Sequence, residues 1–136
     1  MVQHEELYAS PLFELGTENP YGRFFTGQSY LATLAQSPDQ SVFVGNVTFE
    51  PGCRNNWHVH LDGYQILLVI GGEGIYQEAG RIARHLKAGD VVMTNKGIKH
   101  WHGASKNSWF AHIAITSGAG EFYEAVTDEQ YEEAHF

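Results

Sequence analysis

Trp57-His58-Val59-His60-Leu61-Asp62-Gly63-Tyr64-Gln65 is the stretch that decides the fold, and Lys99-His100-Trp101-His102 repeats its main feature further along the chain. Each segment contains a His-x-His pair. In an extended strand, residues i and i+2 point to the same face, so each pair aims two imidazoles in one direction. Two such strands facing each other across a barrel would bring several imidazoles to one point. The pattern therefore predicts a metal site built from β-strands.

The side chains in these segments also indicate the kind of ion. Imidazole nitrogens and an amide oxygen suit a borderline divalent cation such as Mn, Fe, Co, Ni or Zn. Cys53 is the single cysteine of the chain, which excludes an intrachain disulfide and a cysteine-rich zinc site.

Composition sets the broad class of protein. The chain has 136 residues, of which 43% are hydrophobic and 13% aromatic, so it is long enough for one domain with a substantial core. Eight basic residues against sixteen acidic ones give a formal net charge of -8, which argues against nucleic-acid or anionic-membrane partners. The chain shows no apolar run near Glu5 and Glu6, and none of the length of a membrane span. We expect a cytoplasmic protein without a signal peptide that acts on a small molecule.

The rest of the chain reads as an all-β fold. Turn signals such as Pro51-Gly52, Gly71-Gly72 and Ala79-Gly80 separate short apolar runs at roughly ten-residue spacing, which is typical of a sandwich or a closed jelly-roll barrel. We expect strands at Tyr30–Ala35, Ser41–Phe49, Asn56–His60, Gln65–Ile70, Gly74–Ala79, Arg81–His85, Asp90–Met93, His100–His102 and Ser108–Thr116.

Only the end of the chain predicts a helix. Thr127-Asp128-Glu129-Gln130 has the pattern of a capping box, so a short helix should begin there, run to about Ala134 and lie on the barrel surface. The expected organisation is an N-terminal arm over residues 1–28, a β-barrel over 29–126, and a C-terminal helix and tail over 127–136.

The two histidine segments resemble the two motifs of the cupin superfamily. The first motif reads Gly52, five residues, His58-x-His60, four residues, Gln65, six residues and Gly72. The second reads Gly89, five residues, Asn95-x-Gly97, two residues, His100, three residues and Ala104. The similarity extends from about Val42 to Thr116. It implies a cupin double-stranded β-helix, that is, a jelly-roll barrel, followed here by a short C-terminal helix.

Three positions depart from the usual cupin pattern. Asn95 stands where the turn proline is usual and Ala104 stands where the terminal Asn is usual, and both are structural positions. Gln65 replaces the usual Glu and changes the chemistry. Three histidines and a glutamine are all neutral, so a divalent ion would keep its full charge, act as a stronger Lewis acid and disfavour the trivalent state.

Further stretches, among them Lys99-His100-Trp101-His102-Gly103-Ala104 and Val126-Thr127-Asp128-Glu129-Gln130-Tyr131, carry a narrower resemblance. They are similar to a subgroup of small bacterial cupins that includes the manganese-dependent cupin hydroxynitrile lyases. This resemblance implies His58, His60, Gln65 and His100 as metal ligands, with one divalent transition metal, manganese first and Fe, Zn, Ni or Co as alternatives. It also implies His102 and His112 as acid/base candidates. From the residues alone, His102 could ligate, act as a base or only form a hydrogen bond, and His112 could be a buried structural histidine.

These expectations favour a Lewis-acid lyase that cleaves a small hydroxy or carbonyl compound, as in cyanohydrin cleavage. Two alternatives stay open, an Fe-dependent dioxygenase or oxidase and a non-catalytic protein that binds a small molecule. We also expect a homodimer or larger homo-oligomer. Trp57, Trp101 and Trp109 could wall an apolar pocket, although aromatic residues of a barrel more often belong to its core.

Overall fold

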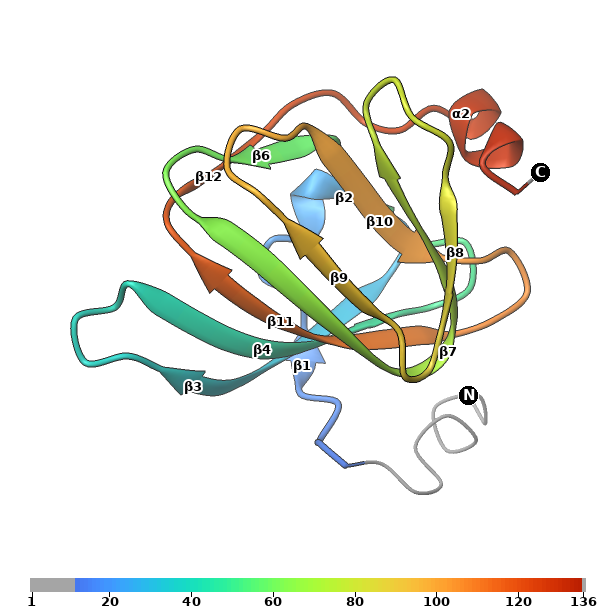
Figure 1. Cartoon of the computed structure of the whole chain (residues 1–136). Coiled ribbons are helices and arrows are strands. Elements are labelled where there is room, and N and C mark those ends of the chain that lie inside the picture. The colour runs from blue at the N-terminus through green and yellow to red at the C-terminus, as the bar shows by residue number, and fades with distance from the viewer. Residues whose placement is uncertain (1–11, 136) are drawn as a thin grey trace.

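The structure is a computed structural model that describes residues 12–135 (Figure 1). These residues form a curled sheet of twelve strands, one short 3-10 helix and one α-helix. In chain order the elements are β1 (Thr17–Glu18), η1 (Gly22–Phe24), β2 (Phe25–Thr26), β3 (Ser29–Gln36), β4 (Val42–Phe49), β5 (Arg54–Asn55), β6 (His58–His60), β7 (Tyr64–Glu78), β8 (Arg84–Lys87), β9 (Val91–Thr94), β10 (His100–Ala104), β11 (Phe110–Ser117), β12 (Gly120–Phe122) and α2 (Asp128–Glu133). The predicted all-β jelly roll with one C-terminal helix is confirmed.

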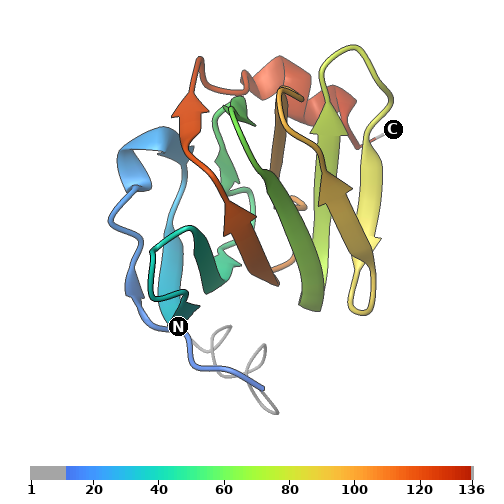
Figure 2. The ribbon, with the colours of Figure 1, turned by 60° about the vertical axis from the view of Figure 1, so that its left-hand side comes forward.

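Strand β7 joins the two halves of the barrel. Its first half pairs with β9 and β11, and this half of the sheet continues through β4 and β3 to β1. Its second half pairs with β8 and β10, from which the other half continues to β5 and β2. Strand β6 pairs with β10 and β12. Figure 2 shows the resulting wall of strands curling around a common interior.

The predicted turn at Gly71-Gly72 is wrong, because β7 continues through these residues as one strand. The ladder between β7 and β11 shifts register here, with Ala111 opposite Gly71 and His112 opposite Val69, so the strand bulges and bends. Gly72 has φ +70°, and a Cβ on it would lie 1.7 Å from the carbonyl oxygen of Trp109. A bulge with glycines bends a strand without ending it, and both features look alike in the sequence.

Strand β8 also differs slightly from the expectation. It begins at Arg84 rather than Arg81, because the Arg81 N–H donates to the Glu78 carbonyl and keeps Arg81 in the turn. The predicted organisation into arm, barrel and tail stays a prediction. Residues 1–11 and 136, which belong to the arm and the tail, lie outside the described residues. In the part of the chain that the structure describes, no helix has the length and apolar character needed to span a membrane.

The α-helix begins where the sequence predicts. Thr127 accepts from the Gln130 backbone N–H, and the Gln130 side chain accepts from the Thr127 N–H, which completes the capping box of α2. The buried Arg54 guanidinium donates to Asp128 at 2.7 Å and to the Val126 carbonyl at 3.0 Å. It also lies 4.4 Å from the ring centre of Tyr131. These contacts hold α2 against the barrel beside β10.

Side chains along β10 point alternately away from the barrel interior and into it, so Trp101 faces the cluster beneath α2 while its histidine neighbours face the interior. Trp101 points away from the interior and packs with Trp57 and Tyr131 in an apolar cluster beneath α2. His100 and His102, one residue to either side, therefore point into the barrel, and both are buried. A second cluster, which includes Phe49, Leu67 and Phe110, fills the interior. The histidines share this interior with the apolar core.

Candidate metal centre

Strands β6 and β10 bring the two His-x-His pairs together. The strands are antiparallel neighbours with His58 directly opposite His100, and the centres of these two rings are 4.1 Å apart. The ring of His60 lies 5.4 Å from that of His58 and 5.3 Å from that of His100. The expected convergence of imidazoles from two strands is therefore present, but the two strands are paired neighbours in one sheet and do not face each other across the barrel as expected.

The backbone orients the first histidine of each pair. Nδ1 of His58 donates to the Asn56 carbonyl, and Nδ1 of His100 donates to the Ile98 carbonyl, each at a distance of 2.9 Å. A carbonyl only accepts, so the proton of each neutral ring lies on Nδ1 and the lone pair on Nε2. A hydrogen bond of this kind is the usual support for a histidine that binds a metal through its other nitrogen.

Buried polar atoms without partners mark the centre of the site. Within residues 12–135, no hydrogen-bond partner reaches either ring nitrogen of His60, Nε2 of His100 or Oε1 of Gln65. Each unsatisfied buried group costs about 1–3 kcal/mol. In the neutral side chains, Nε2 of His100, Oε1 of Gln65 and one of the two ring nitrogens of His60 have a lone pair to offer, and one divalent cation would accept all three. The side chains present therefore fit a bound metal ion.

The structure also offers a different third nitrogen. One ring nitrogen each from His58, His100 and His102 lie within 4.8 Å of one another, and all three residues are buried. His58 and His100 belong both to this group and to the expected ligand set. The two sets differ in their remaining members. The expected set adds His60 and Gln65, whereas the group found in the structure adds His102.

His102 and His112 form a second histidine pair deeper in the barrel. Nε2 of His112 lies 3.1 Å from Nδ1 of His102. Asn55 Oδ1 accepts from the His102 backbone N–H at 2.9 Å, so the amide turns its Nδ2 toward the His102 ring, 3.3 Å from both ring nitrogens. The two histidines are thus linked to each other, and the Asn55 amide holds His102 in place.

Burial keeps the site histidines neutral. It lowers the pKa of His100 to about 4 and that of His112 to about 3. It also lowers the pKa of His58 and His102 well below the ordinary value, with neighbouring histidines adding to the effect. The pKa of His60 falls for the same main reason, and the nearby Gln65 side chain partly opposes the fall. Neutral imidazoles are the form that binds metal ions and accepts protons.

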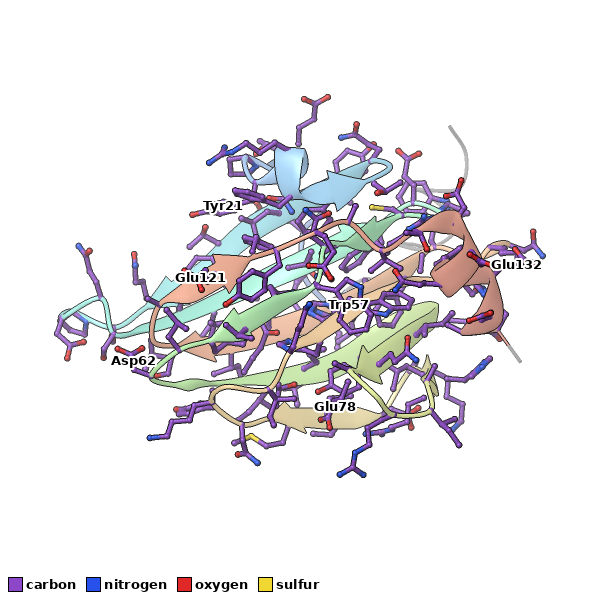
Figure 3. The ribbon with its side chains drawn as sticks, turned by 90° about the horizontal axis from the view of Figure 1, so that it is seen from above. Tyr21, Trp57, Asp62, Glu78, Glu121 and Glu132 are labelled. Atoms are coloured by element: carbon purple, nitrogen blue, oxygen red, sulfur yellow. The ribbon has the colours of Figure 1, made fainter. Side chains whose placement is uncertain are left out.

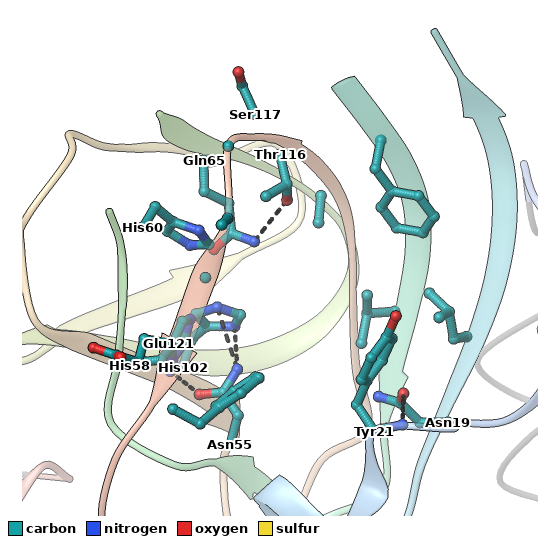
Figure 4. A pocket seen from close by; sticks show the side chains of 18 of the residues that line it. Asn19, Tyr21, Asn55, His58, His60, Gln65, His102, Thr116, Ser117 and Glu121 are labelled. Atoms are coloured by element: carbon teal, nitrogen blue, oxygen red, sulfur yellow. Dashed lines mark hydrogen bonds between the residues drawn. The ribbon is translucent and has the colours of Figure 1, made fainter. Parts of the chain in front are cut away.

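A cavity of about 770 Å³ opens onto these side chains (Figure 4). His58, His60, Gln65, His102 and His112 line it, while Tyr21 and Asn19 lie across the cavity from them. The apolar part of its wall includes Phe25, Leu31, Phe43, Val47, Ala114 and Phe122. Trp57, Trp101 and Trp109 are not among the described residues that line this cavity, so the wall is built from other aromatic side chains.

Asn55 and Thr116 reach the site without having been expected there. Asn55 is 4% exposed, although its neighbourhood in the sequence resembles a turn and carries no signal of an inward side chain. Thr116 could have been found, because it continues the inward alternation of His112 and Ala114 along β11. Its hydroxyl accepts from Gln65 Nε2 at 2.9 Å.

The comparisons with known proteins agree with this architecture. Residues 45–116 match the family described as "Cupin domain". The chain is 42% identical over 113 residues to an (R)-mandelonitrile lyase from Granulicella tundricola, a match that covers 79% of this chain and 86% of that protein.

Among solved structures, a cupin-like protein from Thermotoga maritima is similar with a TM-score of 0.86 and 40% identity, covering 92% of this chain and 97% of that one. A predicted oxalate decarboxylase from the same organism shares the fold, with a TM-score of 0.69 and 22% identity over 78% of this chain and 95% of that one. The chain belongs to the cupin family.

Proposed function

We propose that this cupin is a metal-dependent lyase that cleaves a small neutral hydroxy compound such as a cyanohydrin. The observation that carries the proposal is that His58, His60 and Gln65 line one cavity together with the linked pair His102 and His112, with His100 packed against the first two. The similarity to an (R)-mandelonitrile lyase over most of both chains supports the same reaction class.

We propose His58, His60, Gln65 and His100 as the side chains that hold the metal ion, with manganese as the first candidate. A divalent ion bound there supplies Lewis-acid chemistry, because it polarises a substrate oxygen and lowers the pKa of a hydroxyl. All four side chains are neutral, so the ligands compensate none of the ionic charge. That favours polarisation of a substrate and disfavours a change to the trivalent state.

The pair His102 and His112 is proposed to move the proton. In cyanohydrin cleavage the hydroxyl proton leaves, the bond between the hydroxyl carbon and the nitrile carbon breaks, and cyanide departs with that electron pair. A neutral imidazole of the pair accepts the hydroxyl proton and returns it to cyanide, so that the products are an aldehyde and HCN.

The charges around the cavity favour a neutral substrate. Among the described residues that line it, none is a lysine or an arginine, whereas the carboxylates Asp62 and Glu121 are present. Asp62 lies at the side of the molecule opposite Glu132 of α2, which places it at the end of the barrel away from the helix (Figure 3). A carboxylate substrate would find no lysine or arginine to pair with here and would meet two like charges. An uncharged molecule with an apolar substituent fits the wall better.

The direct test is cleavage of mandelonitrile by metal-loaded protein. The protein would be stripped with a chelator, reloaded with Mn²⁺, and assayed for benzaldehyde and HCN in a ratio of one to one. Release should require Mn²⁺ and should proceed equally with and without oxygen. A reaction that consumes oxygen would instead identify the iron-dependent oxidase class. Saturable binding without turnover of any cyanohydrin would contradict the proposal and favour a binding protein.

A further inference from the structure

We propose that Thr116 is a positioning residue that sets which end of the Gln65 amide faces the histidines. The inference rests on the proposed metal site, in which Gln65 acts as a ligand. Only the oxygen of a primary amide can bind a cation, because the NH₂ group carries two donors and has no lone pair to offer. The terminal torsion of a glutamine is soft and roughly two-fold, so some partner must select the productive orientation.

The strand register places Thr116 for this task. It lies on β11 directly opposite Gln65 of β7, and both side chains line the cavity (Figure 4). Gln65 Nε2 donates to Thr116 Oγ1 at 2.9 Å. Gln65 is 8% exposed, and its Oε1 has no hydrogen-bond partner in the described part of the chain. One end of the amide is thus anchored on the strand, while the other is left free to ligate.

The opposite neighbour of Gln65 does not offer the same anchor. Thr94 of β9 pairs with Gln65 from the other side of β7. Its hydroxyl, however, lies 2.6 Å from the Tyr76 hydroxyl and forms a hydrogen bond with it. Thr116 is therefore the hydroxyl that receives the amide N–H. If it is removed, the NH₂ group is left buried without an acceptor whenever Oε1 faces the metal site.

The test measures the effect of Thr116→Val in two backgrounds, which carry either the asymmetric amide of Gln65 or, after Gln65→Glu, a charged carboxylate with two equivalent oxygens. In the wild type, Thr116→Val should weaken Mn²⁺ binding by about 10- to 100-fold, the usual cost of losing a group that orients a ligand. Thr116→Ser keeps the hydroxyl and serves as the matched control. In the Gln65→Glu background, Thr116→Val should cost much less, because either oxygen of a carboxylate can face the ion.

Titration calorimetry of metal-free protein with Mn²⁺ would measure the affinities of the wild type, Thr116→Val, Thr116→Ser, Gln65→Glu and the double variant Gln65→Glu with Thr116→Val. Circular dichroism melts would check that each variant is folded. An unchanged affinity for Thr116→Val, or an equal loss in both backgrounds, would overturn the inference, since an equal loss indicates a merely structural role. Failure of the wild type to take up Mn²⁺ would overturn it as well. If the wild type binds Mn²⁺ and shows the predicted pattern but cleaves no cyanohydrin, the proposed function fails while the role of Thr116 stands.

Discussion

The two His-x-His pairs look alike in the sequence but differ in the structure. Their first members match, because His58 and His100 each donate from Nδ1 to a backbone carbonyl two residues earlier. Their second members diverge. The ring nitrogens of His60 have no hydrogen-bond partner among residues 12–135, whereas the ring of His102 lies at hydrogen-bond distance from His112 and from the Asn55 amide. We infer that His60 continues the ligand set and that His102 belongs to a separate proton-transfer group.

The largest expected effect is on Mn²⁺ binding, and it distinguishes His58, a ligand in both candidate sets, from His102, which we assign to proton transfer. His58→Ala should abolish measurable Mn²⁺ binding, since it removes a ligand common to both candidate sets. His102→Ala should leave the affinity within about threefold, because the network of His102 ends in Asn55 and His112. Metal analysis and titration calorimetry would measure both. A loss in His102→Ala as large as that in His58→Ala would make His102 a ligand.

The next effect concerns proton transfer. His112→Phe keeps a ring of similar shape in the cavity but removes both nitrogens, so cyanohydrin cleavage should fall by about 100-fold or more while the metal stays bound. Combined with His102→Phe, it should cost little more than either change alone, because the two residues act as a unit. Steady-state assays at saturating Mn²⁺ would report the rates. Independent, multiplying losses would contradict a linked pair.

A smaller effect is expected from the amide that holds His102. Asn55→Ala removes the acceptor of the His102 backbone N–H and the donor beside its ring. We expect about a tenfold lower kcat with little change in Mn²⁺ affinity. Asn56→Ala is the matched control, because that neighbouring amide donates to the Tyr123 carbonyl instead. Equal activity of the two variants would remove Asn55 from the account.

The last effect concerns stability instead of activity, and it is a pH dependence in the metal-free protein. The native pKa of His100 is about 4 and that of His112 is about 3, both below the ordinary value of 6.5. As the pH falls below about 6.5, these histidines therefore take up protons in the unfolded chain but stay unprotonated in the native state. Their contribution to stability is complete above that pH and is lost toward the native values, at up to about 1.4 kcal/mol per pH unit for each histidine.

Urea unfolding at pH 7, 6 and 5 would measure this loss. His112→Phe should show a shallower decline with falling pH than the wild type. His85→Gln, a change at an exposed histidine on β8, should keep the wild-type slope. A stability that stays constant over this range would show that the buried histidines are not held neutral.

Features that depend on residues close together in the sequence could be predicted, whereas contacts between residues far apart in the sequence could not. The His-x-His alternation and the capping box at Thr127 are local patterns, so the inward histidines and the start of α2 were predictable. The bend at Gly71-Gly72 was not, because a bulge with glycines and a turn have the same local composition.

The residues that form hydrogen bonds with one another in the site are much further apart in the sequence. Asn55 meets His102 and Gln65 meets Thr116 across strands, at sequence separations of 47 and 51 residues. Only the register of the folded barrel shows such pairs. The same applies to the difference between His60 and His102, which depends on neighbours from other strands rather than on the shared motif.

Anomalous diffraction from crystals of the Mn²⁺-loaded protein would test the ligand set most directly. The account predicts a single manganese peak coordinated by Nε2 of His58 and His100, a ring nitrogen of His60 and Oε1 of Gln65, with His102 bonded to His112 instead. A peak coordinated by His58, His100 and His102, with Gln65 turned away, would contradict it.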